Sequence, residues 1–216
     1  MAEAAGRRTA VVVGANQRSS SLALRDRLYV EEDAHAVFLD ALQAEGIGEA
    51  LLVSTCDRVE VHAVHCDAGD AARRIVGVLA RHGSYAVGEI DSQLYLLSGE
   101  AALRHMFAVA ASLESTVVGE PNVLGQFKAS WRAARDAGLC GRELDACVQA
   151  AFVAAKRVRS ETAIGEGPVS VVAAAVDLAR TVHGDLARCS ALMIGTGEMG
   201  EMLAAGLRAA GLAGLT

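Results

Sequence analysis

The sequence predicts a mixed α/β (α+β) protein. We expect a ferredoxin-like βαββαβ unit, then a helical segment, then the first strand and helix of a truncated Rossmann domain. Two observations favour this order. In the first hundred residues, short β-branched or alternating stretches are separated by stretches with apolar residues at helical spacing. Helical spacing then prevails until a glycine-rich turn that directly follows an apolar stretch.

The first unit contains four predicted strands and two predicted helices. In residues 58–65, Val59, Val61 and Ala63 alternate with Glu60 and His62, which is typical of a strand with two different faces. The predicted strands are 9–14, 49–54, 58–65 and 93–97, and the predicted helices are 31–45 and 70–82.

The next part is predicted to be helical, over 100–113, 122–136 and a third stretch in which apolar residues recur from Leu144 to Val158. That helix should end near residue 165, and Pro168 can open a fourth helix that runs to about His183. The composition changes at this point. We therefore expect a domain boundary near residue 167, with a catalytic unit over 1–166 and the start of a nucleotide-binding unit over 167–216.

A predicted strand over 191–194 leads into Gly195-Thr196-Gly197-Glu198-Met199-Gly200 and a helix over 201–210. This G-x-G-x-x-G pattern suits a dinucleotide: the first glycine makes the turn, the second admits the pyrophosphate, and the third lets the helix pack closely. A glycine-rich turn in an alanine-rich protein is the simpler alternative. Only 16 residues follow Gly200, so we expect the chain to stop before the second strand of that domain.

Composition limits the possible functions. With 52% hydrophobic and 21% charged residues, the 216-residue chain is globular. Its net charge of −6 gives no general attraction for nucleic acid, so any RNA contact needs a local basic patch. Three patches are candidates: Arg73 with Arg74, Arg132 with Arg135, and the group Lys156, Arg157 and Arg159. The alternative for each is a solvated helix face; we favour the third group, because its helix leads towards the nucleotide unit.

The cysteines and the absence of long apolar runs indicate the compartment. The chain has five cysteines and no C-x-x-C pair, which argues against a zinc site or a disulfide framework. It has neither a signal-peptide pattern nor an apolar run of membrane-spanning length. We therefore expect a cytoplasmic protein with no membrane association and no metal.

One cysteine lies in a polar setting. Ser54-Thr55-Cys56-Asp57-Arg58 falls between two predicted strands, and a nearby guanidinium would lower the thiol pKa and favour a nucleophilic thiolate. The alternative is a cysteine that simply packs, which we adopt for the other four. His105 lies off the apolar stripe of its helix; we interpret it as an exposed histidine unless it faces Cys56.

A second polar run surrounds a predicted helix start. Residues 115–126 supply a hydroxyl, a carboxylate and two amides, on Ser115, Glu120, Asn122 and Gln126. The alternative is that Glu120 and Asn122 serve only to cap that helix.

Taken together and in order, these segments resemble the glutamyl-tRNA reductase family. The resemblance rests on STCDR (54–58), LESTVVGEPNVLGQ (113–126), VRSETAIG (158–165), GPVSV (167–171) and GTGEMG (195–200), and it covers the chain from near residue 9 to its end. Several long sequence motifs that match in the same order along the chain are far more specific for a family than one glycine motif.

The resemblance implies an NADPH-dependent enzyme that reduces glutamyl-tRNA to glutamate-1-semialdehyde, the first step of five-carbon tetrapyrrole synthesis. A cysteine thioester is the intermediate. It implies that Cys56 is the nucleophile, that His105 supports activity, and that residues 195–200 bind NADPH. It places the substrate on Thr55, Asp57, Arg58, Ser115, Glu120, Pro121, Asn122 and Gln126. It also implies a homodimer, and glutamate-1-semialdehyde aminomutase as a partner.

Three departures from the family keep an alternative open. Asp57 stands where asparagine is usual, and a carboxylate there raises the thiol pKa and is able to pair with Arg58. Asn122 replaces the usual glutamine, and we expect the chain to lack the rest of the NADPH domain and the dimerisation domain. A non-catalytic paralogue that binds charged tRNA or a haem-pathway partner is therefore the second hypothesis. A plain NADP dehydrogenase of small molecules is a weak third.

Overall fold

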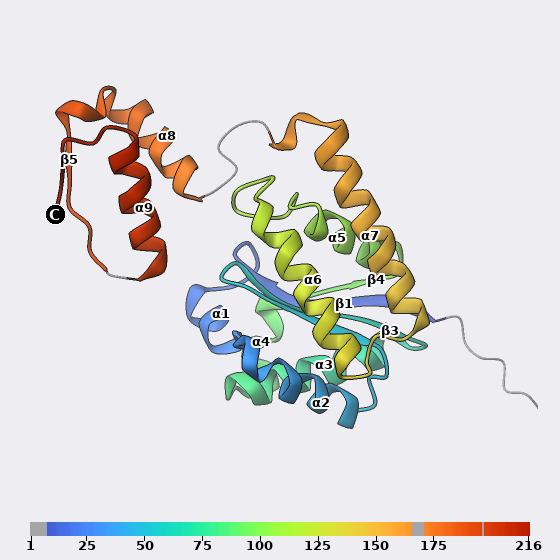
Figure 1. Ribbon diagram of the computed structural model, residues 1–216. Coiled ribbons are helices and arrows are strands. Elements are labelled where there is room, and N and C mark those ends of the chain that lie inside the picture. The colour runs from blue at the N-terminus through green and yellow to red at the C-terminus, as the bar shows by residue number, and fades with distance from the viewer. Residues whose placement is uncertain (1–7, 166–170, 196) are drawn as a thin grey trace, which may run out of the picture.

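The computed structural model describes residues 8–165, 171–195 and 197–216. A four-stranded antiparallel sheet, in the order β2-β3-β1-β4, forms its centre. Helices cover both faces of this sheet (Figure 1). The strands are β1 (Thr9–Asn16), β2 (Ala50–Ser54), β3 (Arg58–His65) and β4 (Tyr95–Ser98).

One face of the sheet carries the helices that lie between the strands in sequence. Val13 and Leu52 from the sheet pack with Leu28, Leu39 and Ile75 of these helices in one buried cluster. The helices are α1 (Leu22–Leu28), α2 (His35–Ala44), α3 (Ala68–Gly83) and the short α4 (Val87–Ile90), with 3-10 turns at Glu32–Ala34 and Asp91–Gln93.

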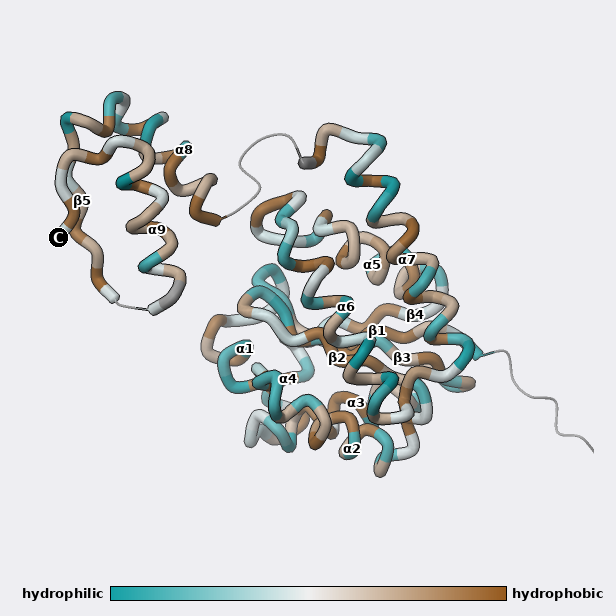
Figure 2. The backbone as a smooth tube through the Cα atoms, viewed as in Figure 1, coloured by the Kyte–Doolittle hydropathy of each residue, from teal (hydrophilic) through white to brown (hydrophobic). Residues whose placement is uncertain are grey.

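The other face is covered by three helices that follow β4, namely α5 (Glu100–Ala110), α6 (Pro121–Asp136) and α7 (Arg142–Glu161). Leu51 and Val53 of β2 pack there with Phe127 and Val148. The result is three layers, and hydrophobic residues recur both in the central strands and in the helices around them (Figure 2). Burial of apolar side chains on both sheet faces stabilises this arrangement.

β3 lies inside the sheet, and both of its faces are buried. Glu60 and His62 alternate with the apolar residues as the sequence predicts, but both are completely buried. Glu60 lies opposite Gly14 of β1, where a Cβ atom would come within 2.4 Å of the Glu60 Cβ atom. The glycine is therefore the residue that gives the Glu60 side chain its room.

The predicted order of strands and helices in the first unit is confirmed, and β3 begins and ends at the predicted residues. The helices α1 and α4 were not predicted, because each has only 7 or 4 residues and shows too little periodicity. The mixed α/β class is therefore found, while the ferredoxin-like label remains a prediction.

The C-terminal segment contains α8 (Val171–His183), β5 (Ser190–Ala191), α9 (Glu198–Ala209) and β6 (Gly214–Leu215), with a 3-10 turn at Leu186–Arg188. β5 pairs in parallel with β6, so the prediction that the chain stops before a second strand is wrong. The predicted strand over 191–194 is also shorter than expected. The predicted helix start at Pro168 and the boundary near residue 167 lie outside the described residues.

The helices give no indication of a membrane span. Within the described ranges, none combines the length and the apolarity that crossing a bilayer requires.

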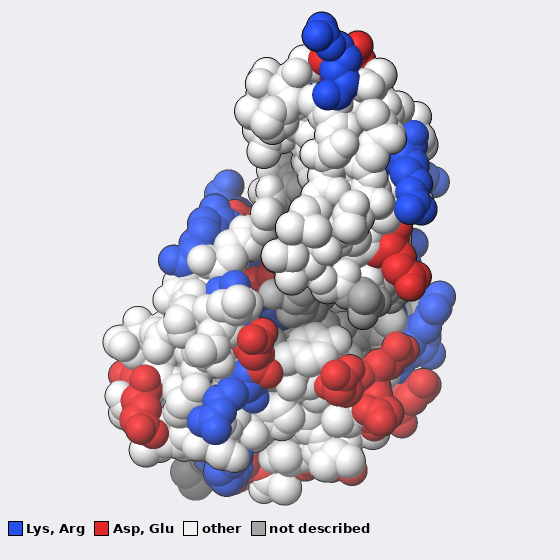
Figure 3. Space-filling view, turned by 90° about the vertical axis from the view of Figure 1, so that its left-hand side faces the viewer, with Lys and Arg blue, Asp and Glu red and all other residues white. Residues whose placement is uncertain are grey.

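On the face drawn in Figure 3, acidic and basic side chains are interspersed, with a group of acidic side chains at its lower right.

The contact between α6 and the sheet predicts that substitutions at two apolar residues of the helical layer differ in their effect on stability. Phe127 is completely buried, whereas Val153 on α7 is 62% exposed. We expect Phe127→Ala to lower the free energy of unfolding by roughly 3–5 kcal/mol, because it leaves a cavity. Val153→Ala should change it by less than about 1 kcal/mol. Urea unfolding of both variants tests this, and equal effects would contradict the layered core.

Candidate active site

Cys56 lies in the tight turn between β2 and β3. The backbone N–H of Thr55 donates to the Arg58 carbonyl at 2.8 Å, and the N–H of Asp57 donates to the Thr55 hydroxyl at 3.3 Å. Thr55 is buried beneath the turn, while Cys56 is exposed. The hairpin therefore holds the thiol at its tip, open to solvent.

The charges around Cys56 disfavour its thiolate. Partial burial, the Asp57 carboxylate and the Glu120 carboxylate raise the pKa of the thiol, and a backbone hydrogen bond and Arg25 offset this only in part. The thiol donates to Asp57 Oδ1 at 3.9 Å. The predicted lowering of this pKa by Arg58 is wrong, whereas the predicted raising by Asp57 is confirmed.

Arg58 points away from the thiol. Its side chain is buried, donates to the Glu114 carbonyl, and lies 3.5 Å from Glu60 Oε1 through Nη1. The reason is strand geometry: Arg58 begins β3, and side chains two residues apart share a face, so Arg58 lies on the side of Glu60 and His62. No ion pair with Asp57 is found among the described residues.

Glu60 is the centre of a buried polar cluster. Its Oε1 accepts from His62 Nε2 at 3.0 Å, and its Oε2 accepts from His105 Nε2 at 2.7 Å and from the Tyr95 hydroxyl. Burial alone would raise the pKa of Glu60, but His62, His105 and Arg58 outweigh it and hold the pKa well below its usual range. Glu60 is therefore an ionised carboxylate surrounded by donors.

His62 lies beside His105 in this cluster. The two rings stack, with centroids 6.1 Å apart, and Phe127 covers His62 edge-on. Burial lowers the pKa of His62, and His105 and Arg58 lower it further, while Glu60 acts in the opposite direction. Since Glu60 accepts from both imidazoles, each Nε2 carries the proton in this arrangement.

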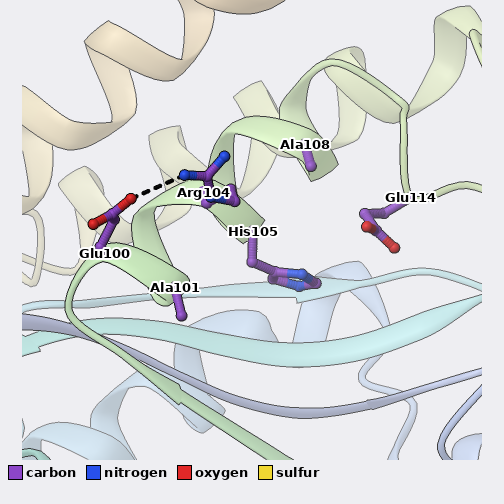
Figure 4. A pocket seen from close by; sticks show the side chains of 6 residues that line it. All are labelled: Glu100, Ala101, Arg104, His105, Ala108 and Glu114. Carbon is purple, nitrogen blue, oxygen red and sulfur yellow. Dashed lines mark hydrogen bonds and ion pairs between the residues drawn. The ribbon is translucent and has the colours of Figure 1, made fainter.

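His105 is not the exposed histidine that we expected. Its side chain is only 11% exposed, and it projects from α5 beside Glu114 into a cavity of about 470 Å³ that Arg104 also lines (Figure 4). Within the described chain its polar partner is Glu60, and no contact with Cys56 is found. A role for His105 therefore acts from this cavity and through Glu60, not by direct contact with the thiol in this structure.

The segment between α5 and α6 is fastened beside the Cys56 turn. Thr116 donates to Asp57 Oδ2 from its backbone N–H at 3.2 Å and from its hydroxyl at 2.6 Å. The Ser112 hydroxyl donates to the Glu120 carbonyl at 2.7 Å. Gly119 has a φ of +87°, and a Cβ atom there would lie 2.2 Å from the Ile164 carbonyl oxygen, so only glycine fits.

This fastening brings further predicted residues to the turn. Ser115 is buried, and its hydroxyl has no hydrogen-bond partner among the described residues. Glu120 precedes Pro121 at the start of α6, but its side chain makes no capping hydrogen bond, so the capping alternative is wrong for Glu120. Asn122 donates to Glu120 Oε1 at 3.4 Å, which leaves both side chains beside the turn.

Gln126 lies one turn further along α6. It is exposed and lines a second cavity of about 420 Å³ with Tyr29 and Ser54. Because Ser54 ends β2 and Tyr29 lies near enough to Cys56 for its pKa to respond to the thiol, this cavity adjoins the Cys56 turn. The predicted substrate residues thus come together from the β2–β3 turn, the segment before α6, and α6 itself.

Four residues of the site were missed in the sequence. Glu60, His62, Tyr95 and Thr116 hold Arg58, His105 and Asp57 in place. The spacing Arg58-x-Glu60-x-His62 on a predicted strand was a usable signal, because it places three polar groups on one face. Tyr95 and Thr116 had no local signal.

The glycine-rich turn before α9 has the geometry of an open loop. Gly195 has a φ of +119°, and a Cβ atom on Gly197, which caps α9, would meet nothing within 4 Å. A Cβ atom on Gly200 would contact the Gly195 carbonyl oxygen at 3.4 Å. Gly195 and Gly197 match the turn and the open approach expected of a dinucleotide loop, whereas a Cβ atom on Gly200 would make only an ordinary van der Waals contact. Thr196 lies outside the described residues, Glu198 begins α9, and Met199 is half-exposed.

The fold and the site define a class: a three-layer α/β protein with a solvent-facing cysteine above a buried carboxylate–histidine cluster. Residues 13–162 match the family model described as "Glutamyl-tRNAGlu reductase, N-terminal domain". Glutamyl-tRNA reductases of Rhodospirillum rubrum and Solibacter usitatus are 46% and 41% identical over 94% and 93% of this chain. The glutamyl-tRNA reductase structure from Methanopyrus kandleri is 30% identical over 95% of it, with a TM-score of 0.65.

The chain therefore belongs to the glutamyl-tRNA reductase family, a family of oxidoreductases. It spans about half the length of the relatives it matches: 47% and 48% of the two curated proteins, and 48% of the Methanopyrus chain. The match covers the N-terminal domain of the family.

The electrostatics of the turn predict that Asp57→Asn makes Cys56 more reactive. Removal of the carboxylate lowers the thiol pKa, while the asparagine oxygen can still accept from Thr116. The protein is alkylated with iodoacetamide over a range of pH, and mass spectrometry quantifies the modified Cys56 peptide. In the variant, alkylation should be faster near neutral pH, and the pH dependence of its rate should shift to lower pH. Cys66, which is also exposed, is the internal control and should not change.

The burial of His62 predicts that the fold loses stability as the pH falls. Since the pKa of His62 is lowered in the folded state, the unfolded chain binds its proton first as the pH falls below about 6.5. Stability from His62 is therefore full above that pH and declines below it, whereas the contribution of Glu60 declines only at lower pH. We expect His62→Gln to flatten the pH dependence of the melting temperature between about pH 7 and 5. An unchanged slope would contradict a buried neutral His62.

Proposed function

We propose that this chain carries the acyl-transfer site of a glutamyl-tRNA reductase. In this reaction Cys56 Sγ attacks the ester carbonyl that joins glutamate to the 3′ ribose of tRNA. A C–S bond forms, the C–O bond breaks, and the proton of the thiol ends on the released ribose hydroxyl. The observation that carries the proposal is the exposed Cys56 at the hairpin tip, in a chain that matches the family over 13–162.

Two buried polar atoms support a polar ligand beside this turn. Ser115 Oγ and Arg58 Nη1 have no hydrogen-bond partner among the described residues, and the ion-pair contact of Arg58 Nη1 with Glu60 Oε1 is long, at 3.5 Å. Buried polar groups are nearly always paired, so unpaired ones on expected substrate positions suit a carboxylate or ester group of the substrate. In this proposal Thr55, Asp57, Glu120, Pro121, Asn122 and Gln126 complete the glutamyl site.

The buried cluster has a positioning role in this proposal. Glu60 holds the Arg58 guanidinium and the His105 ring from one side, which fixes both before the substrate arrives. With Nε2 bonded to Glu60, His105 keeps Nδ1 free to accept a proton from a group in its cavity. This is the way in which His105 supports the reaction.

The proposed cofactor is NADPH, held at residues 195–200. When bound, it supplies the hydride that reduces the Cys56 thioester to glutamate-1-semialdehyde. The three glycines are compatible with it, and Gly197 offers open backbone at the start of α9, where a pyrophosphate binds favourably. The homodimer, the aminomutase partner and the cytoplasmic location stay predictions from the resemblance.

The alternative is a non-catalytic paralogue that binds charged tRNA or a haem-pathway partner. The raised pKa of Cys56, due to its burial, Asp57 and Glu120, favours this alternative. It predicts RNA binding without a covalent adduct.

Covalent labelling distinguishes the two. Incubation with tRNA carrying radioactive glutamate should label the protein through a bond that neutral hydroxylamine cleaves, and Cys56→Ser should abolish the label. Cys66→Ser, at the other exposed cysteine of the sheet unit, should leave it unchanged. Without NADPH the thioester should slowly hydrolyse, so the chain acts as an esterase. Tight tRNA binding with no adduct would replace the proposal by its alternative.

A further inference from the structure

The helices α6 and α7 form a groove that the site described above does not include. Its volume is about 530 Å³, within the range of small-ligand sites. Leu124, Phe152 and Val153 give it an apolar lining, and Lys128, Lys156 and Arg159 give it three positive charges. None of its lining residues is acidic, although the whole chain has a net charge of −6.

The three cations of this groove differ from Arg73 and Arg74, the first basic pair predicted as an RNA contact. Lys128 lies over the Phe152 ring as Arg135 lies over the Trp131 ring, whereas Arg73 and Arg74 both pair with Asp70. In contrast, none of Lys128, Lys156 and Arg159 forms an ion pair with a carboxylate in the described part of the chain. Their charge is therefore available to an external anion.

The groove is connected to the Cys56 turn through Arg159. Its guanidinium donates to the carbonyl of Gly119 at 3.2 Å and to that of Glu120 at 3.4 Å. The same Glu120 carries one of the two carboxylates that act on the Cys56 thiol. A ligand that begins at Cys56 and continues past residues 119–120 thus reaches the groove.

We propose that this groove binds the single-stranded 3′ end of the RNA whose aminoacyl ester lies at Cys56. Phosphates would contact Lys128, Lys156 and Arg159, and an unpaired base would lie against the apolar lining with the Phe152 ring. An acidic protein segment is the alternative occupant, which polyglutamate binding tests. This inference rests on the proposed function for its ligand, and it adds the place where the RNA is held.

Binding of an unacylated glutamate-accepting tRNA transcript tests the groove without the chemistry. We expect the double variant Lys128→Ala/Lys156→Ala to bind roughly tenfold or more weakly near 0.1 M salt, with a shallower dependence of affinity on salt by about 0.7 per lost contact. Arg157→Ala is the matched control, because Arg157 is on the same helix but pairs with Glu161. It should bind within about twofold of the unmodified chain.

Labelling of Cys56 at saturating glutamyl-tRNA separates this inference from the proposed function. The double variant should reach the unmodified extent of labelling but need more RNA to do so. Weakened binding in a chain that never labels supports the groove and overturns the acyl-transfer proposal. Unchanged tRNA affinity in the double variant overturns the groove and leaves that proposal intact. Polyglutamate is the probe for an acidic protein. If the double variant loses polyglutamate binding but keeps tRNA binding, the groove proposal is overturned and the groove is assigned to an acidic protein.

Discussion

The burial of the Glu60 carboxylate inside the sheet is the constraint on which the rest of the site depends. A buried charge is very costly unless donors surround it, and here the donors come from three elements: Arg58 and His62 on β3, Tyr95 on β4 and His105 on α5. Satisfying one carboxylate therefore fixes how α5 lies on the sheet. All four groups contact the same two oxygens, Arg58 as an ion pair at 3.5 Å and the other three by hydrogen bonds.

The same constraint separates the site into two parts. The buried part holds Arg58 and His105, and the exposed part holds the thiol at the hairpin tip, with Asp57 fastened by Thr116. The period of two along a strand causes this separation, since it sends Arg58 to the face of Glu60 while the turn residues stay outside.

The sequence predicted what depends on periodicity and missed what depends on packing. β3 was predicted with its full extent because alternation over eight residues is a strong signal. The predicted environment of Cys56 is wrong because Arg58, although two residues away in sequence, contacts Glu114 and Glu60 and not the thiol. His105 was misjudged for a related reason: it lies off the apolar stripe of α5, yet its partner is a carboxylate buried in the sheet, 45 residues earlier. Such pairings are set by the tertiary structure and have no local pattern.

The raised pKa of Cys56, which follows from burial, Asp57 and Glu120, does not by itself decide against catalysis. In thiol attack, each unit of pKa increase lowers the thiolate fraction at neutral pH about tenfold. It also makes the remaining thiolate roughly threefold more nucleophilic, because reactivity rises with basicity. The net loss is therefore about threefold for each unit. Correct placement of a bound ester contributes orders of magnitude more than this. A carboxylate beside the nucleophile thus slows the chemistry modestly, so the decisive property of the site is whether it holds the ester against Cys56.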